Sequence, residues 1–600
     1  MPNARFSLFA TTLFAVLLTA CGGSSSSGGS NAPDQEENTS LQHQNGSGTA
    51  ENKNHFDQII PAADGEDIAF SVFVPDNPSG KAVPLVIHSH GFGLSRIKDF
   101  ENQDPVQGFT SSDVSGDVAG RSWLEEGYYV ISFDQRGFGD SGGDITVMDP
   151  DLDCDNVSRI IDWAEANLSN LGYRDSDPAI GAIGLSYGGG FQTVCSSVDT
   201  RFDALVPMAT WSHLPYSLYP GNTPKNIWLD LLAVASMGNL APYLNQALLE
   251  ATTTGDINDD AITKLAGHSP RSFCQGEMGR SSSSADALFI QGSHDVLFNI
   301  NEAVENYECW KAQGLDTHLL IQRDGHILPG LQTAGDQILF GTDATLYCNG
   351  DSFDTRDVAM DFLRSKLSGD AATFALPDIC FSLASEQSGQ TFNEVPRGGE
   401  IMTLPSSQVI PGGLNSLVTL LQNLPLDTLL TTLQTLPPQV LSLLQQVLAG
   451  LADPASLADS AGDIVNLLPA DLLRQLTAPP QFIPLQTIAT PSTLAGIPLA
   501  SLELSGGNGD GNTLYVGLGR IAASGSDAVL INDQVLPVTG TGTKLLEMNG
   551  VSQQLEVGDE LGLIVYGFHP YFIHGASLAQ PPLPLEVNGE IDIPIAQGNQ

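Results

Sequence analysis

Basic residues are scarce in this 600-residue chain, in which 23 Lys and Arg stand against 69 Asp and Glu, for a formal charge of −46 at pH 7. So acidic a surface repels phosphate backbones, which argues against a general nucleic-acid-binding protein. It also disfavours adsorption to anionic lipid headgroups. Hydrophobic residues still make up 41% of the chain, so a sizeable core can be buried and wholesale disorder is not expected.

Long hydrophobic runs are lacking as well. The stretch from Phe6 to Leu18 follows Arg5 and is too short to anchor a helix across a bilayer, but its size and flank are typical of a secretory signal. It ends in Leu18-Thr19-Ala20-Cys21, which resembles a bacterial lipobox. The resemblance implies removal of residues 1–20, lipidation of Cys21 and a lipid-anchored protein of the cell envelope, at the outer membrane or cell surface. An ordinary signal peptide with an incidental Cys is the alternative. The polar, Gly- and Ser-rich residues 21–54 are expected to be a flexible tether.

Cysteine is rare, with seven residues. Without Cys21 an even number remains, and all of them lie before the last third of the chain. In an exported protein this predicts up to three disulfides with the pairing open, while buried free thiols are the alternative for some. The six are Cys154, Cys195, Cys274, Cys309, Cys348 and Cys380.

Residues 55–368 alternate between apolar runs and helical stretches. Runs that are apolar on both faces predict central parallel strands covered by helices, and therefore an α/β domain. The predicted strands are 68–74, 84–88, 128–133, 179–184, 202–207, 287–290 and 317–321. A helix is predicted over 157–168, after an Asp-rich lead. That lead lacks the Gly that an EF-hand loop needs at its sixth position, so no metal site is expected there.

The alternation breaks over residues 211–284, which contain helical stretches and an aromatic cluster of Trp211, Tyr216 and Tyr219. An insertion at this point of an α/β sheet is expected to form a cap over the active site. From residue 369 to 600, short β-like runs and Gly/Pro turns predict a β-sandwich. Residues 413–476 are a Leu-rich stretch cut by prolines and predict short helices inserted in that sandwich. These helices would pack on the sandwich or form an apolar surface that covers an apolar substrate or contacts a membrane.

The strongest chemical signal is Gly184-Leu185-Ser186-Tyr187-Gly188, a G-x-S-x-G motif between an apolar strand and a helix. In that context it predicts a nucleophile elbow, a tight turn that presents the Ser186 hydroxyl above the sheet. A neutral Ser is a poor nucleophile and needs a base. In the chain order of α/β-hydrolases, the acid and then the His follow the Ser.

Asp295 comes after the predicted strand 287–290, and His326 comes after the predicted strand 317–321. His326 would take the Ser186 proton, and Asp295 would orient the imidazole and stabilise its cation. His294 competes for the role of base and Asp324 for that of acid. The oxyanion of the tetrahedral intermediate needs donors. The loop His90-Gly91-Phe92-Gly93 predicts the amide of Phe92 as one donor, and the amide of Tyr187 is the other.

These motifs resemble the α/β-hydrolase superfamily over residues 55 to about 366. The run Gly292-x-x-Asp295-x-Leu297-Phe298 is similar to the X-Pro dipeptidyl-peptidase and cocaine-esterase type. So are residues 558–563 and 568–572, which resemble the closing strands of that family's jelly-roll domain, and 513–518, which resemble an earlier strand. The run 134–141 resembles the D-x-R-G-x-G-x-S turn common in this fold, with a structural role.

The resemblance implies a serine hydrolase without cofactor or metal, acting on a small-molecule or peptide acyl substrate. The loop at Phe92 departs from the Arg-x-Pro-Tyr segment of cocaine-esterase-type enzymes, and Asp559 and Glu560 replace the basic residues usual near the last jelly-roll strands. A general ester or amide hydrolase is therefore favoured over an Xaa-Pro dipeptidyl-peptidase. A catalytically idle, surface-binding lipoprotein is the alternative from another class.

Overall fold

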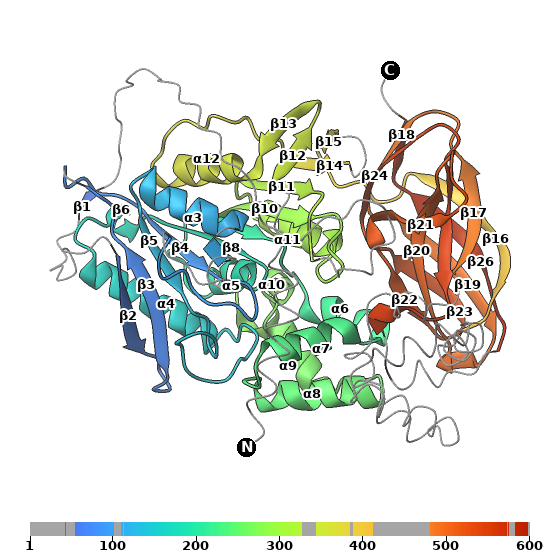
Figure 1. Cartoon of the computed structure of the whole chain (residues 1–600), viewed down its shortest axis with the longest axis horizontal. Coiled ribbons are helices and arrows are strands. Elements are labelled where there is room, and N and C mark those ends of the chain that lie inside the picture. The colour runs from blue at the N-terminus through green and yellow to red at the C-terminus, as the bar shows by residue number, and fades with distance from the viewer. Residues whose placement is uncertain are drawn as a thin grey trace, which may run out of the picture.

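A large mixed sheet forms the centre of the computed structural model (Figure 1). The structure describes residues 42–43, 55–77, 79–100, 110–111, 113–326, 344–383, 388–411, 480–572, 574 and 583–597. The expected signal peptide, Cys21, nearly all of the expected tether and the whole Leu-rich stretch 413–476 lie outside the described residues.

The large sheet has ten strands. In sheet order they are β15 (Gly389–Phe392), β14 (Ile379–Ser382), β11 (Thr317–Gln322), β10 (Asp286–Gly292), β9 (Ala204–Met208), β8 (Ile180–Leu185), β4 (Leu85–Ser89), β5 (Tyr129–Phe133), β3 (Asp67–Phe73) and β2 (His55–Pro61). Pairing is parallel from β5 to β14 and antiparallel at both edges. Every residue of β4, β5, β8 and β9 is buried. The prediction of central parallel strands from continuous apolar runs is confirmed.

Helices cover both faces of this sheet. One face packs on α4 (Asp153–Asn167), α5 (Tyr187–Cys195) and α11 (Ile300–Ala312), the other on α3 (Val114–Leu124) and α12 (Thr355–Leu367). Helix α4 begins before the predicted residue 157, because its first turn includes two Asp residues, whose charges favour a helix N-terminus. No helix in the described ranges is long and apolar enough to cross a membrane.

The predicted helical insertion lies between β9 and β10 and forms a cap beside the carboxyl ends of the central strands (Figure 1). It consists of α6 (Leu214–Leu218), η1 (Pro220–Asn222), α7 (Asn226–Ala235), α8 (Pro242–Thr253), α9 (Asp259–Gly267), α10 (Pro270–Cys274) and η2 (Glu277–Gly279).

The predicted domain boundary at residue 369 is too early. Strand β14 pairs in parallel with β11, and β15 pairs with β14, so the large sheet continues to Phe392. The reason is a second short apolar run, Ile379 to Phe381, which is fully buried against the sheet. The hairpin of β12 (Thr345–Cys348) and β13 (Asp351–Asp354) is tied to this strand by the Cys348–Cys380 disulfide.

The described residues from β16 onward form a β-sandwich beside the large sheet, drawn from gold through orange to red in Figure 1. One sheet contains β16 (Glu400–Val409), β26 (Leu585–Ile593), β19 (Leu499–Gly506) and β23 (Gly542–Glu547). A second contains β17 (Gln481–Thr487), β25 (Glu560–Tyr566), β20 (Thr513–Ile521) and β21 (Ala528–Leu530), with β22 (Leu536–Thr539) also paired to β20. A third contains β24 (Val551–Leu555), β18 (Ser492–Gly496) and β27 (Ile595–Gln597).

The strand predictions for this sandwich hold at 513–518 and 558–563, which fall in or at β20 and β25. Residues 568–572 are not a strand: they include η5 (Pro570–Phe572), one of three 3₁₀ turns here with η3 (Gly509–Gly511) and η4 (Ile531–Asp533). Pro570 has no N–H to donate to a strand ladder, which explains the difference.

The short strands β1 (Gln42–His43), β6 (Gly172–Arg174) and β7 (Asp177–Pro178) form a small separate sheet.

All six remaining cysteines are paired, which confirms the prediction of up to three disulfides and leaves none of the six as a free thiol. The disulfides are Cys154–Cys195, Cys274–Cys309 and Cys348–Cys380.

Candidate active site

Ser186 lies at the turn between β8 and α5, as the motif predicts. Its backbone φ is 60°, in the left-handed region that is unfavourable for a residue with a side chain. The flanking glycines make this turn possible. A Cβ on Gly184 would lie 2.3 Å from the Gly188 carbonyl oxygen, and a Cβ on Gly188 would lie 2.2 Å from the Ser89 carbonyl oxygen. The motif therefore folds a strained elbow that only glycine at both positions permits.

The structure brings Ser186, His326 and Asp295 into one hydrogen-bonded chain. His326 Nε2 lies 2.7 Å from Ser186 Oγ, and His326 Nδ1 lies 2.6 Å from Asp295 Oδ2. Asp295 is fully buried and Ser186 and His326 nearly so. A carboxylate accepts a hydrogen bond from Nδ1–H, so the proton stays on Nδ1 and the lone pair of Nε2 faces the Ser hydroxyl. The arrangement can therefore activate Ser186 as a nucleophile.

The carboxylate of Asp295 is itself fixed by its own loop. Its Oδ1 accepts hydrogen bonds from the amides of Leu297, at 3.0 Å, and Phe298, at 2.6 Å. Its Oδ2 also accepts from Gln291 Nε2 at 3.2 Å. These donors stabilise the ionised carboxylate and leave Oδ2 directed at the imidazole.

The His326 ring is held between two aromatic rings. Phe298 and Trp228 meet it edge to face, with ring centroids 5.2 and 5.8 Å away. Trp228 belongs to the cap helix α7, so the cap contributes to the orientation of the base. Sequence reasoning missed Trp228, because a Trp in an apolar helical stretch is indistinguishable from a core residue.

Two glycines let the loops that carry the acid and the base approach each other. A Cβ on Gly292 would lie 1.7 Å from the Asp324 carbonyl oxygen. Gly325 has φ 146°, and a Cβ there would lie 2.5 Å from the backbone of Asp295. Any side chain at these positions would push Asp295 and His326 apart.

The structure gives the two competing residues other contacts. His294 is turned toward the β-sandwich, where its Nδ1 lies 3.5 Å from Asp533 Oδ2 and its Nε2 lies 3.3 Å from Asn532 Nδ2. Asp324 accepts a hydrogen bond from the amide of Gly325 at 2.7 Å. His294 therefore contacts the β-sandwich, and Asp324 contacts the backbone of its own loop.

Phe92 and Tyr187 lie beside Ser186, with their rings edge to face and 5.3 Å apart. Tyr187 is the first residue of α5, where an amide N–H has no acceptor within the helix and is available to an anion. The loop of Phe92 is anchored by His90. Burial lowers the pKa of His90, its Nδ1 lies 2.8 Å from the Gly91 carbonyl oxygen, and its own carbonyl accepts from Gln135 Nε2 at 3.1 Å.

The turn of residues 134–141 has structural contacts. The Asp134 carboxylate pairs with the buried guanidinium of Arg96 and accepts hydrogen bonds from the amides of Arg96, at 2.6 Å, and Asp140, at 2.8 Å. Arg136 pairs with Asp64. Within the described ranges, no group of three or more His, Cys, Asp or Glu side chains is arranged to hold a metal ion.

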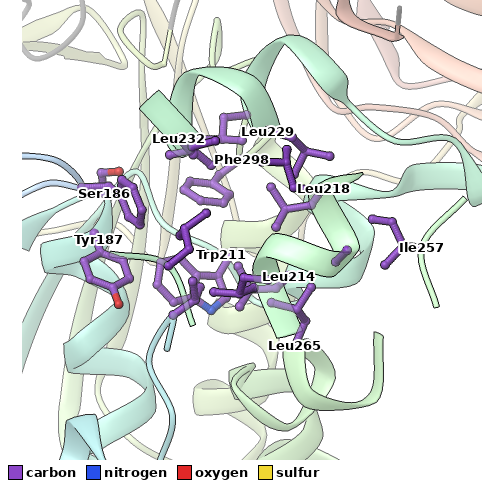
Figure 2. A pocket seen from close by; sticks show the side chains of 18 residues that line it. Ser186, Tyr187, Trp211, Leu214, Leu218, Leu229, Leu232, Ile257, Leu265 and Phe298 are labelled. Atoms are coloured by element: carbon purple, nitrogen blue, oxygen red, sulfur yellow. The ribbon is translucent and has the colours of Figure 1, made fainter. Parts of the chain in front are cut away.

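An apolar pocket opens next to Ser186 and extends into the cap (Figure 2). Figure 2 shows Ser186 on one side of the pocket and Ile257 on the other. The lining residues come from the Phe92 loop, the segment between β5 and α4, the elbow, the Asp295 loop and the cap. They are Phe92, Val147, Ser186, Tyr187, Trp211, Leu214, Leu218, Leu229, Leu232, Ala233, Leu240, Leu244, Ala247, Leu248, Ile257, Leu265, Leu297 and Phe298.

This sheet, elbow and Ser-His-Asp arrangement define a serine hydrolase of the α/β-hydrolase fold, which acts on esters or peptides. Residues 64–328 match the family described as X-Pro dipeptidyl-peptidase (S15 family). The part of the chain that contains the Ser-His-Asp arrangement is therefore similar to the S15 family.

Solved structures with the same fold cover nearly the whole chain. An α-amino acid ester hydrolase has a TM-score of 0.56 at 14% identity and covers 91% of this chain and 97% of its own. A CocE/NonD family hydrolase from Staphylococcus aureus has a TM-score of 0.56 at 12% identity, with 90% and 93% covered. An aminopeptidase from a marine sediment Thaumarchaeota archaeon has a TM-score of 0.53 at 12% identity, with 95% and 99% covered.

Among curated proteins, an uncharacterized 31.7 kDa protein of the traX-finO intergenic region of Escherichia coli is 32% identical over 144 residues. The match spans 24% of this chain and 41% of that relative's length.

Proposed function

We propose that this protein is an esterase that cleaves esters of apolar carboxylic acids through a covalent acyl-enzyme on Ser186. The observation that carries the proposal is the pocket beside the Ser186 hydroxyl, whose lining is almost entirely aliphatic and aromatic. An apolar acyl chain would leave water for that surface, at a gain of roughly 0.8 kcal/mol per buried methylene.

In the first half of the reaction, Ser186 Oγ attacks the ester carbonyl carbon while its proton passes to His326 Nε2. Asp295 stabilises the imidazolium, and the amides of Phe92 and Tyr187 donate to the oxyanion. His326 then gives the proton to the departing alkoxide. In the second half, His326 Nε2 takes a proton from water as the water oxygen attacks the acyl carbon. The bond between the acyl carbon and Ser186 Oγ then breaks, His326 returns the proton to Oγ, and the carboxylic acid leaves.

A second candidate is an Xaa-Pro dipeptidyl-peptidase, favoured by the family match. Such an enzyme must bind the ammonium group of a free peptide N-terminus, for which a carboxylate near the acyl pocket is the natural partner. None of the described residues that line the pocket is acidic. The pocket therefore supports the ester of an apolar acid over a charged dipeptide.

The experiment is a comparison of matched substrates: p-nitrophenyl esters of increasing acyl length, and Xaa-Pro p-nitroanilides. The proposal expects ester hydrolysis that improves with acyl length up to the capacity of the pocket, little turnover of the anilides, and loss of both in Ser186→Ala. Preferential turnover of Xaa-Pro anilides would instead establish the peptidase. Unchanged ester hydrolysis in Ser186→Ala would contradict the assignment of the nucleophile.

We also propose that Cys21 is lipidated and anchors the enzyme in the cell envelope. The lipobox-like run before Cys21 and the three disulfides, which form and persist in oxidising compartments, support this. The proposal expects wild type in the membrane fraction and Cys21→Ala in the soluble fraction, with incorporation of labelled fatty acid only in wild type. A membrane-bound, unlabelled wild type would contradict it.

A further inference from the structure

The segment that carries Asp295 connects β10 to α11, and we call residues 292–298, which begin at the last residue of β10, the acid loop. Every residue of this loop is buried. A loop has no ladder to satisfy its carbonyls, and a buried carbonyl without a donor costs free energy. The identity of the donors therefore decides what holds Asp295 in place.

The cap supplies one donor. Lys225 lies directly before α7, and its Nζ donates to the carbonyls of Val296, at 3.0 Å, and Leu297, at 3.1 Å. Lys225 is only 7% exposed. Burial lowers its pKa to about 8, against the carboxylates of Asp295 and Glu302, which act to raise it. Placing an ammonium group here costs desolvation energy, which its contacts with the acid loop offset in part.

The β-sandwich supplies the other donor. Gln534 follows η4, is 3% exposed, and its Nε2 donates to the carbonyls of Asp295, at 2.9 Å, and Ser293, at 3.3 Å. Its Oε1 accepts from Asn549 Nδ2 at 3.2 Å, which fixes the orientation of the amide. The preceding turn contains two residues with positive φ, Asn532 at 55° and Asp533 at 58°. This turn has an unfavourable backbone and presents Gln534 to the acid loop.

Four carbonyls of the acid loop, at residues 293, 295, 296 and 297, thus receive hydrogen bonds from two side chains outside the large sheet. The same loop fixes the base, because the Val296 amide donates to the His326 carbonyl at 3.1 Å. Neither Lys225 nor Gln534 lines the substrate pocket.

We infer that Lys225 of the cap and Gln534 of the β-sandwich are positioning residues, which together hold the acid loop so that Asp295 and His326 stay aligned with Ser186. The inference rests on the proposed triad. It makes the two accessory parts of the molecule components of the catalytic geometry, each acting through the backbone of one loop. Lys225 adds a positive charge near Asp295, and Asp295 and Glu302 are the carboxylates that face it.

The test uses Lys225→Met and Gln534→Met in the full chain, since Met keeps a similar volume and removes the donor. Each variant is expected to lose about ten- to a hundred-fold in kcat on a p-nitrophenyl ester with little change in KM, because a small misalignment slows chemistry and neither substituted side chain lines the pocket. Controls are Lys264→Met, a half-exposed cap lysine paired with Asp260, and Gln408→Met on an exposed strand position. Both should keep wild-type kcat.

Two further readouts separate positioning from a general loss of stability. In Lys225→Met the acid limb of kcat/KM should move to higher pH, because loss of the cation leaves Asp295 to favour the His326 imidazolium more strongly. Gln534 is uncharged, so Gln534→Met should leave that limb in place. The double variant should lose less than the product of the single losses, because both side chains hold one loop.

Wild-type kcat in either folded single variant, or an unmoved acid limb in Lys225→Met, would overturn the inference. If Lys225→Met does not fold, Gln534→Met with its kcat and KM decides the matter. Ser186→Ala, measured in parallel, separates a failure of the proposed triad from a failure of this inference. Activity that survives in Ser186→Ala contradicts the triad. Activity that is lost in Ser186→Ala but unchanged in the two positioning variants contradicts only this inference.

Discussion

At the residue scale, Ser186, His326 and Asp295 form a hydrogen-bonded series in which each side chain is oriented by a neighbouring group. Backbone amides of Leu297 and Phe298 fix Asp295, Asp295 fixes the His326 tautomer, and the strained elbow fixes the Ser186 hydroxyl. Function at this scale depends on which atom of each group faces its neighbour.

Asp295→Asn tests that dependence. Because Oδ1 accepts from two amides, the Asn oxygen should stay there, and its NH₂ should face His326 Nδ1. The imidazole would then carry its proton on Nε2 and could not accept from Ser186. We expect kcat for ester hydrolysis to fall by about 10³- to 10⁴-fold with an unchanged fold. Asp324→Asn is the control and should keep most of the activity; the reverse result would make Asp324 the acid.

A second prediction at this scale concerns stability and pH. Burial raises the pKa of Asp153 to about 7, although Thr146 and the Asp149 amide donate to its Oδ2. A carboxyl whose pKa is raised by folding is protonated preferentially in the folded state. The free energy of unfolding therefore falls as the pH rises from about 4 through 7.

In Asp153→Asn that fall should be smaller than in wild type, as measured by urea unfolding at pH 5 and pH 8. Asp155→Asn is the control, because Asp155 is the half-exposed partner of Arg159. Its free energy of unfolding should depend on pH as that of wild type does. Equal pH dependence in wild type and Asp153→Asn would show that Asp153 does not titrate in this range.

The residues of the triad could be predicted from the sequence because each follows an apolar strand, and the strand order of the fold sets their order along the chain. Lys225 and Gln534 could not, because a single Lys before a helix and a single Gln in a loop carry no periodic or motif signal. Their roles depend on hydrogen bonds to residues that lie 71 and 239 positions away in the sequence.

At the element scale, the cap helices shape the substrate pocket. Helix α8 contributes Ala247, a small buried residue, to a lining that otherwise consists mostly of large side chains. Periodicity predicted an insertion here, but not which faces line a pocket, because a pocket-lining Leu and a core Leu look alike in sequence. The domain boundary was misplaced for a related reason: four-residue β14 is too short to distinguish from a loop.

Ala247→Trp should shorten the pocket. We expect kcat/KM for long-chain esters to fall by about ten-fold or more relative to acetate esters, because a large side chain excludes the distal acyl carbons. Gln246→Trp, at the neighbouring exposed position, is the control and should leave the chain-length profile unchanged. A uniform fall for all chain lengths in Ala247→Trp would indicate a damaged fold and not a shortened pocket.

At the scale of the whole molecule, the cap, the large sheet and the β-sandwich meet around the acid loop. Asn299 donates to Tyr216 of the cap and to Asn549 of the sandwich, at 3.0 and 2.9 Å. The pattern of apolar runs predicted the parts and the cysteine count predicted up to three disulfides. Neither predicted this junction, which depends on loop residues with no sequence pattern.

The Cys274–Cys309 disulfide ties cap helix α10 to α11 across this junction. The double variant Cys274→Ser, Cys309→Ser should lower the free energy of unfolding by about 2–4 kcal/mol in urea, because the unfolded chain regains the freedom of an open loop. Added reductant should decrease the free energy of unfolding of wild type by a larger amount than that of the variant. An unchanged urea midpoint in the variant would show that the junction is held without the disulfide.

The central claim is that Ser186 is the nucleophile of a working triad, and covalent labelling tests it most directly. Wild type treated with a fluorophosphonate should gain the mass of a single adduct, and peptide mapping should place it on Ser186. Ser186→Ala should gain none, and His326→Ala should react far more slowly. An unlabelled wild type, or an adduct on another residue, would contradict the account.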